Sequence, residues 1–114
     1  DQLRSDFGAK VKVVEWMKIQ NYLSDASTIV NTTSLGMVGN TNLPIPLNTL
    51  KKNTLVTDIV YTPIETHLLA TAAEMGCRTV DGLGMLIHQA IPGFERWFGI
   101  KPGDSQPLRE LLIK

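Results

Sequence analysis

The chain has 114 residues, with eleven basic and eleven acidic side chains, and 43% of its residues are hydrophobic. This composition is typical of one globular domain, and the even charge balance provides no basic surface for nucleic acid. No apolar run approaches the roughly 20 residues that span a bilayer, and no signal-peptide pattern opens the chain, so we expect a cytoplasmic protein. A single cysteine and two separated histidines exclude an internal disulfide and indicate no metal site.

The first elements are predicted as a helix end followed by a strand. Residues 1–7 have apolar side chains four positions apart, and Gly8 follows where a helix commonly ends. No N-cap precedes them, so we expect the chain to begin partway through an element of a longer protein. Residues 10–16 alternate and are rich in β-branched side chains, which predicts a first strand. A helical turn is expected over residues 17–23.

Three more strands are predicted, at residues 26–34, 55–61 and 77–81. The first of these is a β-rich run that ends in polar residues and a glycine, as expected for a loop at the carboxyl edge of a sheet. Residues 40–48 contain two prolines and therefore predict a surface connection. Pro63 suits the first positions of the helix that follows the middle strand.

Residues 81–89, Asp-Gly-Leu-Gly-Met-Leu-Ile-His-Gln, lead from a strand end through two glycines into a helix. A helix that starts at the carboxyl edge of a sheet offers unpaired N–H donors, and glycine permits approaches that a Cβ would hinder. If the helix begins near Gly82, then Met85 and Gln89 lie on one stripe. A soft apolar side chain and an amide facing one space suit a flat ring beside a hydroxylated ligand.

The same helix is expected to kink, because Pro92 lacks the N–H that would bond to the carbonyl of His88. Residues 106–112 predict a last amphipathic helix. Strands that alternate with helices predict an α/β fold with a parallel sheet of about four strands. Four aromatic side chains are spaced like packing residues: Trp16, Phe94, Trp97 and Phe98.

Polar residues at three strand ends, 31–34, 58–61 and 81–89, meet at one edge of a parallel sheet and could line one crevice. The Thr and Ser side chains of the first stretch could equally cap the following turn. For Tyr61 the residues alone favour an interior ring with a satisfied hydroxyl. Asp58, inside an apolar strand, is expected to order nearby backbone rather than to catalyse. With no glycine-rich phosphate loop and no nucleophile–base arrangement, the spacing predicts a binding surface without a catalyst.

Four stretches, in this order, resemble the carboxyl-terminal part of shikimate dehydrogenase: residues 31–37, 58–66, 81–90 and 94–99. The resemblance spans most of the chain and implies part of a Rossmann-like NADP-binding domain. Residues 1–84 would be the later half of that domain, and residues 85–114 would be carboxyl-terminal helices that return toward a substrate domain. We therefore expect a carboxyl-terminal fragment of the enzyme.

The resemblance implies reversible reduction of 3-dehydroshikimate to shikimate with NADPH, a step of chorismate and aromatic amino-acid biosynthesis. By motif position Tyr61 and Gln89 contact shikimate, which reverses the interior interpretation of the tyrosine. The implied cofactor-binding residues are Thr33 and Ser34 along the cofactor, Ile59 through its backbone, Gly82 at the nicotinamide, and Met85 packed against it. No residue matches the family's catalytic lysine and aspartate, so the isolated chain is expected to be inactive.

The resemblance also makes the predicted strands the third to sixth of the Rossmann order 3-2-1-4-5-6. Without the first two, the fourth strand has an unpaired edge, and such edges recruit partners. We expect the chain to dimerise or swap through that edge, or its first predicted strand to be displaced. Two alternative functions remain: a quinate/shikimate dehydrogenase that uses NAD, and a noncatalytic small-molecule or protein-binding module.

Overall fold

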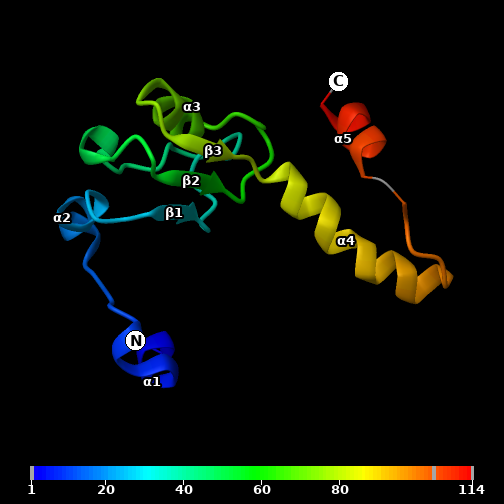
Figure 1. Ribbon diagram of the computed structural model, residues 1–114, viewed down its shortest axis with the longest axis horizontal. Coiled ribbons are helices and arrows are strands. Elements are labelled where there is room, and N and C mark those ends of the chain that lie inside the picture. Colours follow the sequence, from blue (N-terminus) through cyan, green and yellow to red (C-terminus); the bar gives the residue numbers. More distant parts are fainter. Residues whose placement is uncertain (1, 104, 114) are drawn as a thin grey trace.

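The computed structural model describes residues 2–103 and 105–113. A parallel three-stranded sheet lies at its centre (Figure 1). The strands are β1 (Thr28–Asn31), β2 (Leu55–Asp58) and β3 (Arg78–Val80), in the spatial order β1-β2-β3. In the register of the ladders Thr28 lies opposite Leu55, and Leu55 opposite Arg78. The predicted α/β class and its parallel sheet are therefore confirmed.

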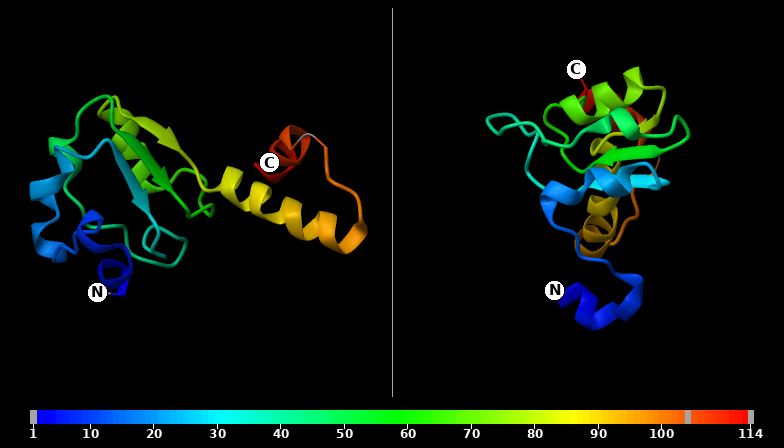
Figure 2. Two further views of the ribbon diagram at one scale, coloured as in Figure 1. Left: turned by 60° about the horizontal axis from the view of Figure 1, so that its bottom comes forward. Right: turned by 90° about the vertical axis from the view of Figure 1, so that its left-hand side faces the viewer.

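Helices surround only part of this sheet. They are α1 (Gln2–Phe7), α2 (Gln20–Leu23), α3 (His67–Glu74), α4 (Leu83–Phe98) and α5 (Gln106–Leu112), with 3-10 turns η1 (Gly8–Lys10), η2 (Trp16–Lys18) and η3 (Leu47–Thr49). Helix α3 packs on the sheet, whereas α4 leads away from it with α5 alongside, and α1 lies apart (Figures 1 and 2). Among the described residues, no helix combines the length and hydropathy of a membrane span.

The core lies between α3, η3 and β2. Val56 and Ala72 are completely buried, and the other members of this cluster are Leu47, Leu68, Leu69 and Cys77. The alternating burial along β2 places one face of the strand toward α3. Cys77 is buried within this cluster.

Helix α3 begins at His67, four residues beyond the predicted start at Pro63. Thr66 is its N-cap, because the hydroxyl oxygen accepts the N–H of Leu69 at 3.4 Å. The strand before it is also shorter than predicted and ends at Asp58. The intervening residues form an irregular loop instead, which contributes to the site described below.

The strand predicted over residues 10–16 is not formed. Residues 11–15 have no regular structure, although the backbone is extended at Val11 and Glu15. A strand needs a neighbour for its backbone hydrogen bonds, and no strand among the described residues pairs with this segment. The prediction of a fourth strand is therefore wrong for this chain. The segment is attached to α2 by the Lys12 ammonium, which lies 4.5 Å from the centroid of the Tyr22 ring.

The aromatic side chains predicted to pack are each at least 42% exposed, although the rings of Phe94 and Phe98 contact each other with their centroids 4.6 Å apart. Trp97 is 78% exposed and Phe98 62%, because α4 extends beyond the sheet and its packing partner is the short helix α5. Helix α4 continues through Pro92 as one helix and ends at Gly99, which has a φ of 70°. The Gly99 N–H closes the last turn on the carbonyl of Glu95 at 2.8 Å.

Candidate functional site

A buried hydrogen-bond network joins the carboxyl ends of β1 and β2. Asp58 is only 1% exposed. One of its carboxylate oxygens accepts from Asn31 Nδ2 and from the Val60 N–H, each at 3.0 Å, and the other accepts from the Thr66 hydroxyl at 2.8 Å. These donors compensate for burial of the charge. Asp58 therefore orders the surrounding backbone, as the sequence predicts.

Asn31 extends this network into the loop after β1. Its Oδ1 accepts the N–H and the hydroxyl of Thr33, at 3.0 and 2.8 Å. Its Nδ2 also donates to the carbonyl of Leu35 at 3.0 Å, and the Thr33 hydroxyl oxygen accepts the Leu35 N–H at 3.1 Å. Thr33 thus caps a turn, which was one of the two interpretations left open by the sequence.

The two loops and the start of α4 enclose a pocket of about 360 Å³ at the carboxyl edge of the sheet. The pocket is lined by Thr32, Thr33, Ser34, Met37, Ile59, Val60, Tyr61, Thr62 and Met85. Five of the seven predicted site residues meet here. Thr33 therefore both caps its turn and lines the pocket. Tyr61 is 44% exposed at the pocket wall, so the interior position that the residues alone favoured is wrong.

Four lining residues were not predicted as site residues: Thr32, Met37, Val60 and Thr62. The loop that carries Met37 is held by its own hydrogen bonds, from Gly36 N–H to the Thr41 carbonyl at 2.8 Å and from Asn40 Nδ2 to the Ser34 carbonyl at 2.9 Å. A further bond joins it to the loop that follows β2, from Val38 N–H to the Thr62 carbonyl at 3.0 Å. All four lie in the stretches at residues 31–37 and 58–66 that resemble the family, and this was the signal that could have identified them.

Gly82 lies where the carbonyl groups of Ile59 and Val60 converge. A Cβ on Gly82 would lie 2.4 Å from the Ile59 oxygen and 2.6 Å from the Val60 oxygen, so no larger residue fits without backbone movement. By contrast, a Cβ on Gly84 would have no neighbour within 4 Å. The first glycine of the pair therefore allows α4 to start directly against the end of β2, which places Met85 at the pocket.

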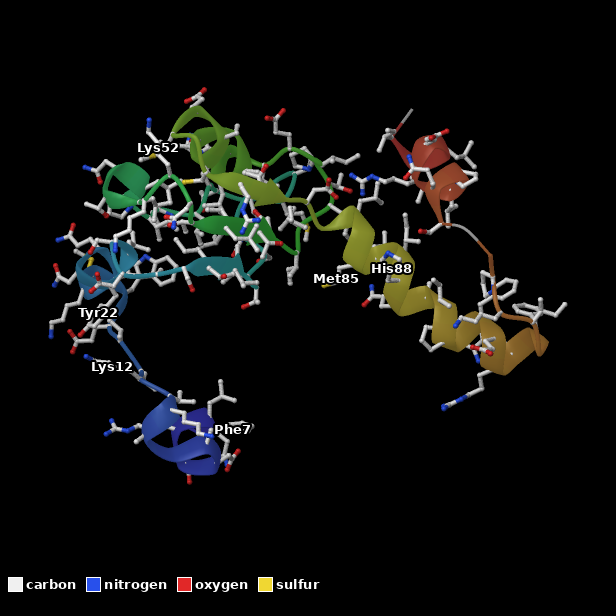
Figure 3. All side chains as sticks on the ribbon, viewed as in Figure 1. Phe7, Lys12, Tyr22, Lys52, Met85 and His88 are labelled. Carbon is white, nitrogen blue, oxygen red and sulfur yellow. The ribbon has the colours of Figure 1, made fainter. Side chains whose placement is uncertain are left out.

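Gln89 lies one turn beyond Met85 on α4 and is exposed, outside the set of pocket-lining residues. His88, which follows Met85 along α4 (Figure 3), is also exposed and is likewise not among the lining residues. The structure thus brings together the predicted residues of the two loops with Met85. Gly82, which is buried, and Gln89, which is exposed, are not among the lining residues.

An ion pair that the sequence did not indicate joins α5 to the turn before α4. Arg109 donates from Nη1 to Asp81 Oδ1 at 3.1 Å and from Nη2 to Oδ2, and the same Oδ1 accepts the Leu83 N–H at 3.0 Å. The hydrogen bonds from Arg109 hold the pKa of the Asp81 carboxyl below its usual value; partial burial opposes this effect, and the Leu83 N–H adds to it. The two partners are 28 positions apart, so no periodicity relates them.

A parallel α/β sheet with a pocket at the carboxyl ends of its strands defines a Rossmann-like ligand-binding domain. Residues 82–112 match the family model described as the shikimate 5'-dehydrogenase C-terminal domain. Shikimate dehydrogenase (NADP(+)) of Cereibacter sphaeroides is 58% identical over 113 residues, which make up 99% of this chain and 40% of that protein. The chain therefore belongs to the shikimate dehydrogenase family, and it spans about 40% of the length of this curated relative.

Solved structures agree with this assignment. A quinate dehydrogenase of Corynebacterium glutamicum in complex with NAD matches 97% of this chain with a TM-score of 0.81 and 35% identity, over 39% of its own length. A shikimate 5-dehydrogenase of Thermus thermophilus in complex with NADP(H) and shikimate matches 90% of this chain with a TM-score of 0.73 and 27% identity, over 37% of its own length.

Proposed function

We propose that this chain forms part of the nicotinamide site and the substrate site of an NADP-dependent shikimate dehydrogenase, which interconverts 3-dehydroshikimate and shikimate. The observation that carries the proposal is the pocket, in which Thr33 and Ser34, Ile59 and Tyr61, and Met85 meet from three separate segments. Residues 1–84 would belong to the NADP domain and residues 85–114 to the helices that return toward the substrate domain. The NADP(+) named for the curated relative supports this cofactor.

The pocket fits the nicotinamide end of such a cofactor. Its volume of about 360 Å³ lies near the lower end of the range of roughly 300–1,000 Å³ for small-molecule sites. The thioether side chains of Met37 and Met85 offer soft apolar surface to a flat ring. The backbone carbonyl of Ile59 is a suitable acceptor for a carboxamide, and the hydroxyls of Thr33 and Ser34 suit the adjoining ribose. Bound NADP would supply the hydride chemistry, and these residues would hold and orient it.

The substrate would lie between Tyr61 and Gln89. The phenol hydroxyl and the side-chain amide can both exchange hydrogen bonds with the hydroxyl and carboxylate groups of shikimate. Among the described residues, no lysine, histidine or carboxylate lines the pocket. Proton transfer would therefore require groups from the part of the family's length that this chain does not cover, and the chain by itself should bind without turnover.

A second candidate is a quinate/shikimate dehydrogenase that uses NAD. The structural match to the quinate dehydrogenase of C. glutamicum, which has NAD bound, favours this alternative. The rates of the full-length protein with NADP and NAD, each tested with shikimate and with quinate, separate the two. A preference for NADP with shikimate supports the first candidate, and turnover of quinate with NAD supports the second.

Methionine methyl NMR tests the proposed site on the chain itself. The chain has four methionines, of which Met37 and Met85 line the pocket whereas Met17 and Met75 do not. With 13C-methyl labelling and single Met→Leu variants for assignment, NADP+ is titrated to a concentration on the order of 10 mM, which detects binding as weak as about 2.7 kcal/mol. We expect saturable shifts of Met37 and Met85 alone.

Two results would contradict the proposal. One is the absence of any shift, and the other is an equal shift of all four methyl groups, which indicates nonspecific association. A second titration with shikimate, with observation of the Gln89 side-chain amide and of Tyr61 labelled at its ring carbons, tests the substrate end separately. The variants Tyr61→Phe and Gln89→Leu should each weaken this second titration and leave the first one unchanged.

A further inference from the structure

Arg109 lies on α5, outside the pocket, but its contacts reach the turn from which α4 enters the site. Both terminal nitrogens of its guanidinium bond to Asp81, whose side chain is 24% exposed. The Asp81 carboxylate also accepts the Leu83 N–H, the first backbone donor of α4. A planar guanidinium bound in this bidentate manner fixes orientation as well as distance. The pair therefore ties α5 to the first residue of α4.

We propose that Arg109 is a positioning residue of the site: through Asp81 it sets the direction in which α4 leaves the sheet, and so the aim of Met85 and Gln89. This inference rests on the function proposed above. It differs from a purely stabilising role because it predicts which atoms move when the contact is lost.

The turn before α4 is restrained from two sides. On the side of β2, Gly82 fits against the carbonyl groups of Ile59 and Val60, where even one extra carbon would collide. On the side of α5, Arg109 holds Asp81. Without the second restraint the glycine contact still fixes the position of the turn, and a tilt of the helix about it is opposed mainly by the buried side chains of Leu83 and Ile87.

The effect of a tilt grows with distance along the helix. At a rise of 1.5 Å per residue, Met85 lies about 4.5 Å and Gln89 about 10.5 Å beyond Gly82. A tilt of about 10° would then displace Met85 by about 0.8 Å and Gln89 by about 1.8 Å. A misplacement of about 1 Å in a positioned group can cost on the order of a hundredfold in rate. Loss of the ion pair should therefore disturb the substrate end more than the nicotinamide end.

The test compares Arg109→Met, which keeps an apolar stem but removes both donors, with Arg109→Lys, which keeps the charge but loses the bidentate geometry. Arg96→Met is the matched control, because Arg96 lies on the exposed last turn of α4. All are made in the 114-residue chain without ligand. The NMR readouts are hydrogen exchange at the Leu83 amide and chemical shifts of the Met37 and Met85 methyls and the Gln89 side-chain amide.

For Arg109→Met we expect exchange at Leu83 to become roughly tenfold faster, as for loss of one charge-assisted hydrogen bond. The Gln89 amide should shift more than the Met85 methyl, Met37 should remain unchanged, and Arg109→Lys should be intermediate. Asp81→Asn should reproduce the shift at Gln89, and addition of Arg109→Met to it should cause no further change.

Unchanged Leu83, Met85 and Gln89 signals would overturn the inference, as would equal changes at Met37 or in the Arg96→Met control. NADP+ titration then separates this inference from the proposed function. If NADP+ does not bind the original chain, the proposed function fails, while the ligand-free signals still decide whether Arg109 positions α4. If NADP+ and shikimate bind and Arg109→Met weakens neither, the positioning role is wrong and the proposed function stands.

Discussion

Replacement of Gly82 by alanine is expected to destabilise the fold and move α4 away from β2. The added Cβ would lie 2.4 Å from the carbonyl oxygen of Ile59 and 2.6 Å from that of Val60. Carbon and oxygen atoms that are not bonded rarely approach within 3 Å, so the helix start must move by several tenths of an ångström at least. Gly82 has a φ of −77°, so alanine adopts this backbone without strain and the collision alone sets the cost.

We expect the substitution to lower the free energy of unfolding by about 1–3 kcal/mol, the usual cost of forcing a carbon into a packed site. Gly84→Ala is the matched control, because it lies two residues along the same helix and its Cβ would meet nothing within 4 Å. There the higher helix propensity of alanine should raise the free energy of unfolding by up to about 1 kcal/mol.

Urea denaturation followed by circular dichroism measures both changes, and the Met85 methyl resonance reports movement at the pocket. Opposite signs for the two variants support the account of this turn. If Gly82→Ala is as stable as Gly84→Ala, or leaves the Met85 resonance unchanged, the close approach of α4 to β2 does not position the site and the reasoning is refuted.

Three further predictions concern the buried network, the ion pair and the sheet edge. Thr66→Val should lower the free energy of unfolding by about 2–4 kcal/mol, since it removes a buried donor to Asp58 and the cap of α3. Thr66→Ser keeps the hydroxyl and should cost less than half as much. If the two variants lose equal free energy of unfolding, the effect comes from packing and not from the hydroxyl. Because the folded-state pKa of Asp81 is lowered, its ion pair should stabilise the fold above the unfolded pKa of about 3.9 and lose this effect as pH falls through the folded value. The free energies of unfolding of the chain and of Asp81→Asn, compared between pH 7 and 3, measure this effect. A difference between them that does not shrink below about pH 4 would contradict it. Within the described residues β1 pairs only with β2, so we expect the chain to self-associate through the free edge of β1. Sedimentation should show less self-association for Val30→Pro, which removes an N–H on the edge of β1 that faces away from β2. A chain that stays a tight monomer at high concentration would rule this expectation out.

Local sequence determined the elements that form the site. The β-branched runs of β1 and β2 and the glycine turn before α4 carry short-range signals, and the carboxyl edge of a parallel sheet is where such ends must meet. The meeting of the strand ends near Thr33, Ile59 and Met85 was therefore predictable from local sequence, whereas the place of Tyr61 at the site was expected only from the family resemblance.

Tertiary structure alone decided the features that depend on distant partners. The segment predicted as a strand at residues 10–16 has strand-forming residues, but no strand of the described residues pairs with it, so residues 11–15 stay irregular. Helix α3 starts at His67 because Thr66, held by the buried Asp58, caps it there. Arg109 reaches Asp81 across 28 positions. Propensity and periodicity describe residues within a few positions of one another, whereas strand pairing, burial of a charge and a long-range ion pair exist only once the chain has folded.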